Sequence, residues 1–204
     1  MTTTIRHVVF DIGQVLIHYN PEAAYKTLIP DDEERAWFLA NVCTQHWNEE
    51  QDRGRGWAEA EEHLIEQYPD HASMIRAFRE NWHTMITHAY DDTVELLHGV
   101  IDQGHDVTML TNFASDTFRE VRERYDFLKR PRGVTVSGDV RLIKPDPAIF
   151  DHHTKSFDLD PAATLFIDDN AKNVESAREF GWHAVQHTNA EALKPELERL
   201  GLLP

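Results

Sequence analysis

Short runs of β-branched and aliphatic residues alternate with amphipathic helical segments along most of this chain, and no other feature constrains its fold as strongly. The strand-like runs are RHVVFDI at 6–12, DVTMLT at 106–111, GVTVS at 133–137, TLFID at 164–168 and HAVQ at 183–186. Apolar runs of this length are typical of strands buried on both faces of a parallel sheet. Strands that alternate with helices predict right-handed crossover units, and therefore a three-layer α/β fold.

Capping signals locate several helix ends. Asp146 followed by Pro147 predicts a helix N-terminus, because the aspartate side chain can accept a backbone hydrogen bond and proline suits the first turn. Gly181 predicts the end of a helix that begins near Ala171. Ser115 is the predicted N-cap of the helix that follows the run at 106–111.

Residues 20–90 interrupt the alternation, because they show helical periodicity and no convincing strand. Trp57, Ala60 and Leu64 fall on one helical face, as residues spaced by three or four positions do. We therefore expect two parts. Residues 1–19 and 91–204 would form the α/β core, and residues 20–90 a helical cap inserted into it.

Composition argues against several classes of partner. The chain has 20 Lys and Arg against 36 Asp and Glu, a formal charge of −16 that repels nucleic acid and anionic lipid. No apolar run approaches the roughly 18 residues that a membrane-spanning helix needs, and the first residues lack the layout of a secretory signal. The single cysteine, Cys43, permits no intramolecular disulfide. We expect a cytoplasmic protein that acts on a small molecule, without nucleic acid or membrane partners.

Polar residues follow the predicted strands at the positions where ligands bind in open parallel sheets. The set comprises Asp11, Thr111, Asn112, Lys144, Asp168 and Asp169. Each residue alone has an ordinary explanation as a turn or helix-cap residue. Their occurrence together, in order along successive strand ends, indicates a single site.

These residue types suit phosphoryl transfer. The Asp11 carboxylate can attack phosphorus and form an aspartyl-phosphate, which divides one difficult hydrolysis into two displacements. Several carboxylates in one place repel one another unless a divalent cation binds them, and Mg²⁺ prefers oxygen ligands. Lys144, the hydroxyl of Thr111 and the amide of Asn112 can donate to phosphoryl oxygens.

Four segments, VVFDIGQVL, MLTNF, RLIKPDP and FIDDNAKNV, resemble the four sequence motifs of the haloacid dehalogenase superfamily. The resemblance covers the whole chain, including a helical cap inserted after the first motif, and it implies a hydrolase with a Rossmann-like core. It implies Asp11 as nucleophile and Mg²⁺ held by Asp11, the Gly13 carbonyl and Asp169, with or without Asp168. By the same resemblance the phosphoryl group is bound by Thr111, Asn112 and Lys144, and the metal loop is braced by Asn173.

Gly13 departs from the usual pattern. Phosphatases of this superfamily usually carry a second aspartate two residues after the nucleophile, and it protonates the leaving group. The segment FDIGQVL resembles that of some small bacterial sugar-phosphate phosphatases, which also show glycine there. Either a cap residue supplies the proton, with His18 and His46 as the nearest candidates, or the substrate has an acidic leaving oxygen, as an anomeric sugar phosphate does.

Three functions stay open. The favoured one is Mg²⁺-dependent hydrolysis of a small, sugar-phosphate-like metabolite. The second is metal-independent dehalogenation of a 2-haloacid by the same aspartate, which the acidic pair in FIDDNAKNV disfavours. The third is a non-catalytic metal-binding relative. In the cap, Arg53 of DRGRG is a candidate substrate contact, with a solvated turn as the alternative. Nothing in the sequence indicates an oligomeric state.

Overall fold

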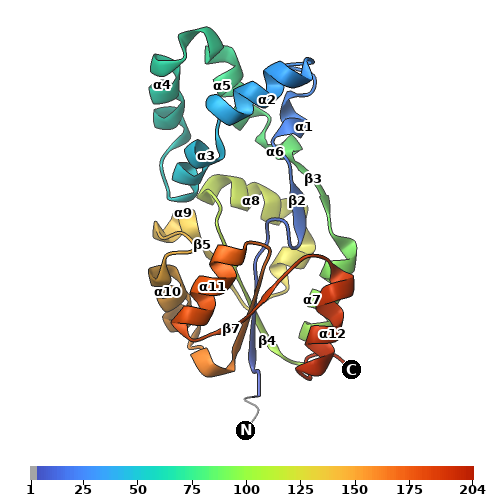
Figure 1. The fold of residues 1–204 in the computed structure, drawn as a ribbon. Coiled ribbons are helices and arrows are strands. Elements are labelled where there is room, and N and C mark those ends of the chain that lie inside the picture. The colour runs from blue at the N-terminus through green and yellow to red at the C-terminus, as the bar shows by residue number, and fades with distance from the viewer. Residues whose placement is uncertain (1–3) are drawn as a thin grey trace.

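The computed structural model describes residues 4–204, whose sheet contains five parallel strands (Figure 1). In spatial order they are β5 (Val134–Val136), β4 (Asp106–Thr111), β1 (His7–Phe10), β6 (Thr164–Asp168) and β7 (His183–Gln186). Each neighbouring pair is parallel. The predicted α/β fold is confirmed, because the strand-like runs form one parallel sheet with β1 at its centre.

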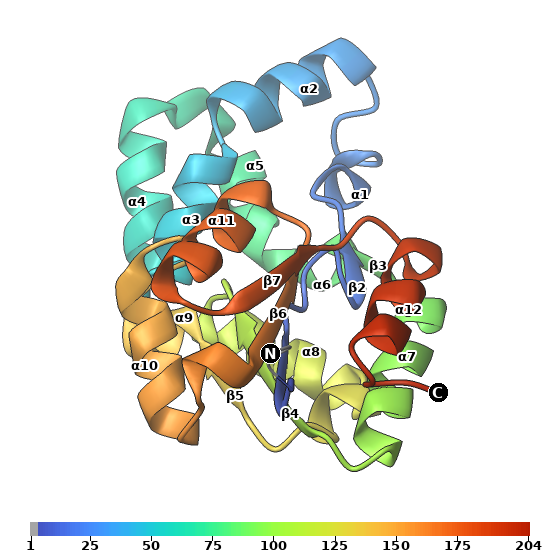
Figure 2. The same cartoon turned by 60° about the horizontal axis from the view of Figure 1, so that its bottom comes forward.

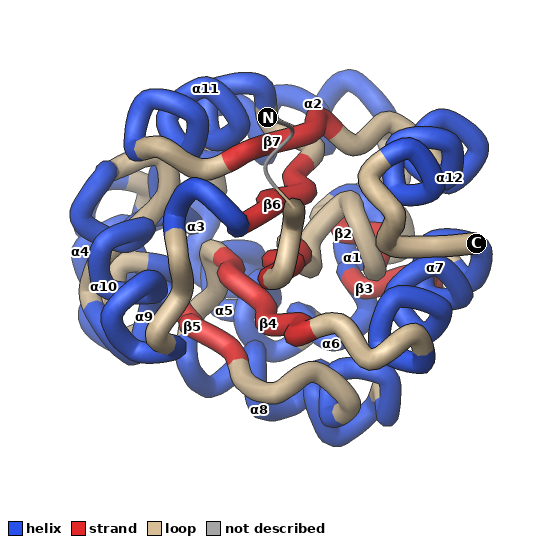
Figure 3. The backbone as a smooth tube through the Cα atoms, turned by 90° about the horizontal axis from the view of Figure 1, so that it is seen from below, coloured by secondary structure: helices blue, strands red, loops and turns tan. Residues whose placement is uncertain are grey.

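Helices cover both faces of this sheet, as the view along it shows (Figure 3). On one side lie α7 (Asp91–Asp102), α8 (Ser115–Arg124) and α12 (Ala190–Arg199), and on the other lie α10 (Pro147–Phe157) and α11 (Ala171–Phe180). Successive residues of β1 face opposite layers: Val8 and Phe10 pack in one apolar cluster and Val9 packs in the other. This alternation produces the expected three layers.

Two of the predicted helix ends are confirmed and one is wrong. The Asp146 side chain accepts a hydrogen bond from the Ala148 N–H, with Pro147 opening α10. Gly181 ends α11 with a φ of 107°, in the left-handed region that favours glycine. Ser115 is the first helical residue of α8, and Ala114 holds the extended capping position with no side-chain bond. The helix therefore starts one residue before the point where a Ser115 cap would place it.

Residues 20–90 lie beyond the carboxyl end of the sheet (Figures 1 and 2). Their helices are α1 (Glu22–Tyr25), α2 (Asp32–Asn41), α3 (Gln45–Asp52), α4 (Trp57–Gln67), α5 (Ala72–Glu80) and α6 (Trp82–Met85), with a 3₁₀ turn at Pro69–His71. The expectation of no strand in this segment is wrong, because β3 (Ile86–Ala89) pairs antiparallel with β2 (Ile17–Tyr19). Its sequence, ITHA, has two exposed polar residues in the middle, so it forms neither an apolar run nor a clear alternation.

The smaller elements of the core are α9 (Ser137–Val140) and 3₁₀ turns at Asp126–Lys129 and Pro161–Ala163. Within residues 4–204, no helix combines the length and the apolar character that crossing a membrane requires.

Charged and apolar contacts fix the cap helices to the core. Arg79 of α5 pairs with Asp116 at 3.0 Å and Glu120 at 2.6 Å on α8. The rings of Trp82 and Phe113 meet edge to face with centroids 5.4 Å apart. The largest apolar cluster runs without a break from the cap helices into the sheet. The cap therefore has a defined position over the carboxyl ends of the strands.

Candidate active site

Sheet register brings the predicted acidic residues together. Phe10 is paired with Met109 on one side and Ile167 on the other, so the next residue of each segment lies at the same level of the sheet. Asp11 follows β1 and donates its backbone N–H to the Ile167 carbonyl at 2.9 Å. Asp168 is the last residue of β6. A parallel sheet thus converts a sequence separation of more than 150 residues into adjacency.

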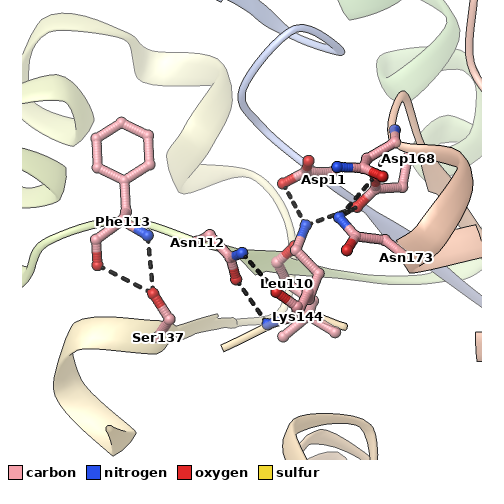
Figure 4. A network of polar contacts seen from close by, with 9 residues as sticks. Asp11, Leu110, Asn112, Phe113, Ser137, Lys144, Asp168 and Asn173 are labelled. Carbon is pink, nitrogen blue, oxygen red and sulfur yellow. Dashed lines mark hydrogen bonds and ion pairs between the residues drawn. The ribbon is translucent and has the colours of Figure 1, made fainter. Parts of the chain in front are cut away.

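Lys144 occupies the centre of this group, in the loop between α9 and α10 (Figure 4). Its Nζ lies 2.8 Å from Asp11 Oδ1, 2.7 Å from Asp168 Oδ2 and 3.0 Å from the Leu110 carbonyl. An ammonium has three N–H donors. Lys144 donates two of them, to Asp168 and to the Leu110 carbonyl, while its contact with Asp11 is an ion pair without hydrogen-bond geometry. The lysine therefore orients Asp168 through a hydrogen bond and attracts Asp11 by charge, and one of its N–H donors is left for a phosphoryl oxygen.

Asp168 is fully buried, and protein donors satisfy both of its oxygens. Oδ1 accepts hydrogen bonds from the Asn170 backbone N–H at 2.8 Å and from Asn173 Nδ2 at 3.0 Å. Oδ2 accepts from Lys144 and, at 3.1 Å, from Asn173. The carboxylate is therefore held in one orientation by Asn173 and Lys144, and it has little capacity left for a metal ion.

Asp11 and Asp169 retain that capacity. One carboxylate oxygen from each of Asp11, Asp168 and Asp169 lies within 4.8 Å of the others. Apart from the ion pair with Lys144, no group in residues 4–204 gives the buried Asp11 Oδ1 a hydrogen bond. Asp169 is half-buried at the rim of the cavity. The all-oxygen donor set and the excess of carboxylates over ammonium fit Mg²⁺.

The pKa values of these residues reflect their burial and the closeness of the carboxylates to one another. Burial raises the pKa of Asp11 to about 8, with Lys144 acting to lower it and Asp168 to raise it further. Burial followed by the neighbouring Asp168 raises the pKa of Asp169. Burial opposes the charge of Lys144, yet the two adjacent carboxylates raise its pKa. Without a bound cation, ionisation of all the carboxylates in the site is therefore unfavourable.

The remaining predicted core residues lie at the same place. Thr111 is buried and Gly13 half-buried, and both line a cavity of about 200 Å³ that also contains Asp11. The Asn112 side chain donates to the Lys144 carbonyl at 3.0 Å and accepts from the Lys144 N–H at 2.9 Å. Asn112 therefore holds the lysine loop, a role that its residue type alone did not suggest.

A larger cavity of about 830 Å³ extends from this point between the core loops and the cap. Arg53 lines this cavity. Its side chain is 48% exposed, and its Nε lies 3.3 Å from Glu50 Oε1. Apolar side chains form part of the wall: Tyr19, Leu39, Phe78 and Ile143. The site can therefore hold a substrate whose charged group contacts the carboxyl ends of the strands and whose remainder contacts the cap.

The two histidines proposed as proton donors lie elsewhere. His18 is hydrogen-bonded to Thr87 at 2.6 Å, and the His46 side chain is 86% exposed. In the described part of the chain, neither ring lines either cavity. The cap residues that do line both cavities are Gln45, Asn48 and Asp52 of α3. The sequence holds one weak signal for them, since Asp52 is adjacent to Arg53 in DRGRG, but the direction of α3 decides which side chains face the site.

Comparisons with known proteins identify similar hydrolases by sequence and by fold. The model of the haloacid dehalogenase-like hydrolase family matches residues 5–181. A sesquiterpene phosphatase from Aspergillus oryzae is 28% identical over 202 residues, which is 98% of each chain. An (S)-2-haloacid dehalogenase from Burkholderia cepacia is 28% identical over 111 residues, 54% of this chain and 47% of its own. The fold matches that of a haloacid dehalogenase family enzyme from Bacteroides thetaiotaomicron, solved with magnesium and inorganic phosphate. Its TM-score is 0.68 at 22% identity, covering 91% of this chain and 95% of the other.

Proposed function

This chain belongs to the haloacid dehalogenase-like hydrolases, and we propose that it is a Mg²⁺-dependent phosphomonoesterase that works through an aspartyl-phosphate on Asp11. The observation that carries the proposal is the buried cluster of Asp11, Asp168 and Asp169 around a single lysine. Such a cluster is costly unless it serves a cation and an anionic substrate. The similarity to a phosphatase along nearly the whole chain also supports it.

Mg²⁺ would be held by Asp11, Asp169 and the Gly13 carbonyl, and when bound it would offset the negative charge that gathers as phosphate meets carboxylate. Asp168 and Asn173 would position Lys144 and the loop. The Asp11 oxygen attacks phosphorus, the ester P–O bond breaks, and Lys144 keeps the attacking carboxylate in line. Water then hydrolyses the aspartyl-phosphate and returns Asp11 to its starting state.

The division of the chain follows the same proposal. Residues 1–19 and 91–204 would carry the chemistry, and residues 20–90 would cover the site and select the substrate. Arg53 would contact the substrate from the cap, because it lines the larger cavity. We infer a small, cytoplasmic, sugar-phosphate-like metabolite as substrate. The partly apolar wall and the sesquiterpene phosphatase relative add isoprenoid monophosphates to the compounds that should be tested.

Dehalogenation of a 2-haloacid is the second candidate, because of the dehalogenase relative and because Gly13 carries no proton donor. Asp169 disfavours it, since a carboxylate at the rim of the site repels a carboxylate substrate when no cation is bound. A non-catalytic metal-binding protein is the third candidate, favoured by the same glycine.

A paired assay separates these functions. Phosphate release from a panel of sugar and isoprenoid monophosphates would be measured with Mg²⁺ and with EDTA, beside halide release from 2-chloropropionate without metal. We expect phosphate release with Mg²⁺ alone, and its loss by several orders of magnitude in Asp11→Asn, whose amide cannot attack phosphorus. Asp70→Asn, an exposed aspartate of the cap, is the matched control. Halide release in EDTA would favour the second candidate, and no turnover of any compound the third.

A further inference from the structure

The proposed reaction needs a residue that donates a proton to the leaving oxygen. Gly13 cannot supply it, and His18 and His46 lie away from the cavities. Outside the acidic cluster and Lys144, the described residues that line the smaller cavity include two with an ionisable proton, Tyr19 and Asp52. Burial raises the pKa of Tyr19 far above its ordinary value, so that phenol holds its proton too firmly to exchange it at neutral pH. Asp52 is the remaining group.

Asp52 is attached firmly to the core although it belongs to the cap. It ends α3, and its backbone carbonyl accepts a hydrogen bond from Ser137 Oγ at 2.6 Å. The same hydroxyl accepts the Phe113 N–H at 2.8 Å, so α3 is joined to the loop after β4, which carries Asn112 (Figure 4). The hydrogen bond from Ser137 uses the backbone carbonyl of Asp52, and the residue lines both cavities.

The turn after Asp52 adds a second restraint. Gly54 has a φ of 96°, and a Cβ built there would lie 3.0 Å from the Gly138 carbonyl oxygen and 3.3 Å from Arg141 Cγ. A side chain would therefore meet both backbone strain and a collision, and glycine permits close approach between this turn and α9. The end of α3 has a fixed position over the site, which a proton donor requires.

We propose that Asp52 is the general acid and base of this phosphatase, giving a proton to the leaving oxygen and taking one from the attacking water. This inference rests on the proposed function. In the first displacement, the Asp11 oxygen bonds to phosphorus, the ester P–O bond breaks, and the Asp52 proton passes to the departing oxygen. In the second, water attacks phosphorus, the Asp11–phosphorus link breaks, and the water proton returns to Asp52. The sum is ester plus water to alcohol plus phosphate.

The surroundings of Asp52 suit both roles. Burial raises its pKa to about 7, the Ala114 backbone N–H acts to lower it, and Glu49 on the same helix raises it. The other ionisable groups that line the two cavities, from the cap and the core together, are Tyr19, Glu22, Cys43, Arg53, Lys144, Lys172, Asp11 and Asp169. An acid whose pKa is near the working pH can both donate and accept a proton.

The test compares leaving groups. kcat/KM would be measured in Mg²⁺ for p-nitrophenyl phosphate, whose leaving group needs little protonation, and for a primary alkyl phosphate, whose leaving group needs much. Asp52→Asn should lower kcat/KM for the alkyl ester by about 10²- to 10⁴-fold and that for the aryl ester by less than about tenfold. Because kcat/KM includes no step after formation of the aspartyl-phosphate, slow hydrolysis of that intermediate does not mask the difference.

The pH profile gives an independent result. For the alkyl ester, kcat/KM of the parent protein should fall above about pH 7, because Asp52 then loses the proton that it donates. In Asp52→Asn this fall should be absent. Glu59→Gln, an exposed acid of α4, is the control and should retain the parent profile. Two results would overturn the assignment of Asp52 and leave the phosphatase proposal standing. One is an equal loss of kcat/KM on both esters in Asp52→Asn, and the other is an unchanged kcat/KM for the alkyl ester with the fall above pH 7 still present. If the parent protein releases no phosphate from any ester, both fail.

Discussion

Replacing Lys144 by methionine should destabilise the metal-free protein severely. At an effective dielectric constant of about 20, each ammonium–carboxylate contact at 2.8 and 2.7 Å represents roughly 6 kcal/mol of attraction. Desolvation offsets much of this, and removal of one partner from a buried ion pair costs about 3 to 5 kcal/mol. Because total stabilities are about 5 to 15 kcal/mol, the loss is a large fraction of the whole.

The chain contains a matched control for this experiment. Lys155 Nζ lies 2.7 Å from Asp151 Oδ2, the same separation as between Lys144 and Asp168, but the Lys155 side chain is 74% exposed. An exposed pair contributes about 0 to 1 kcal/mol. Lys144→Met and Lys155→Met both remove an ammonium–carboxylate contact of 2.7 Å. They differ in burial and in the carboxylates left without a partner, which are Asp11 and Asp168 for Lys144 and Asp151 for Lys155.

Unfolding by urea and by heat would be followed in EDTA. We expect a Tm lower by roughly 6 to 20 °C for Lys144→Met, at about 2 to 4 °C per kcal/mol for a chain of this size, and little change for Lys155→Met. Adding Asp168→Asn to Lys144→Met should restore part of the loss, because one uncompensated charge is removed. The deficit should also shrink as the pH falls. Carboxyls with a raised folded-state pKa favour folding while protonated and lose that contribution as the pH rises. Equal effects of the two lysine substitutions would refute this electrostatic account.

Three further predictions concern the metal, the cap and Gly13. Mg²⁺ at 100 times its dissociation constant should stabilise the parent protein by about 2.7 kcal/mol, and Asp169→Asn should remove most of the accompanying rise in Tm, as a thermal scan with and without EDTA would show. Arg53→Ala should change the ranking of substrates in the phosphate-release panel more than it changes hydrolysis of p-nitrophenyl phosphate, and equal losses throughout would contradict a specificity role. Gly13→Asp should speed alkyl phosphate hydrolysis in the Asp52→Asn background, because a Cβ at Gly13 meets no heavy atom within 4 Å. No gain in kcat/KM from a folded double variant would mean that an acid at this position does not reach the leaving oxygen.

Local patterns were enough to predict most of the core. The runs at 106–111, 164–168 and 183–186 form strands with those bounds, since each is a short apolar run bounded by polar or turn residues. Asp146, Pro147 and Gly181 mark helix ends because capping depends on a few neighbouring backbone groups. Strand β3 was not predicted, because its pairing with β2, which places His88 opposite His18, depends on residues distant along the chain.

The gathering of Asp11, Lys144 and Asp168 was predictable for a more general reason. In a parallel sheet the carboxyl ends of neighbouring strands meet at one edge, so a residue that follows a strand is brought to the site whatever its distance in sequence. The roles within the group were less visible. Asn112 binds the backbone of Lys144, and Asn173 and Lys144 occupy the oxygens of Asp168. Those pairings depend on side-chain directions that no spacing in the sequence encodes.

The cap side of the site was decided by tertiary structure alone. Helical periodicity shows which residues of a helix face inward, but the orientation of α3 over the sheet depends on contacts such as Ser137 with Asp52 and Arg79 with Asp116. Those contacts bring Asp52 to the cavity and leave His46 in solvent, although the two residues belong to the same short helix. The sequence by itself determined the sheet, its ligand-binding edge and the acidic cluster, because these follow from local patterns and the geometry of parallel strands. Long-range packing determined which cap residues line the cavity that contains Asp11.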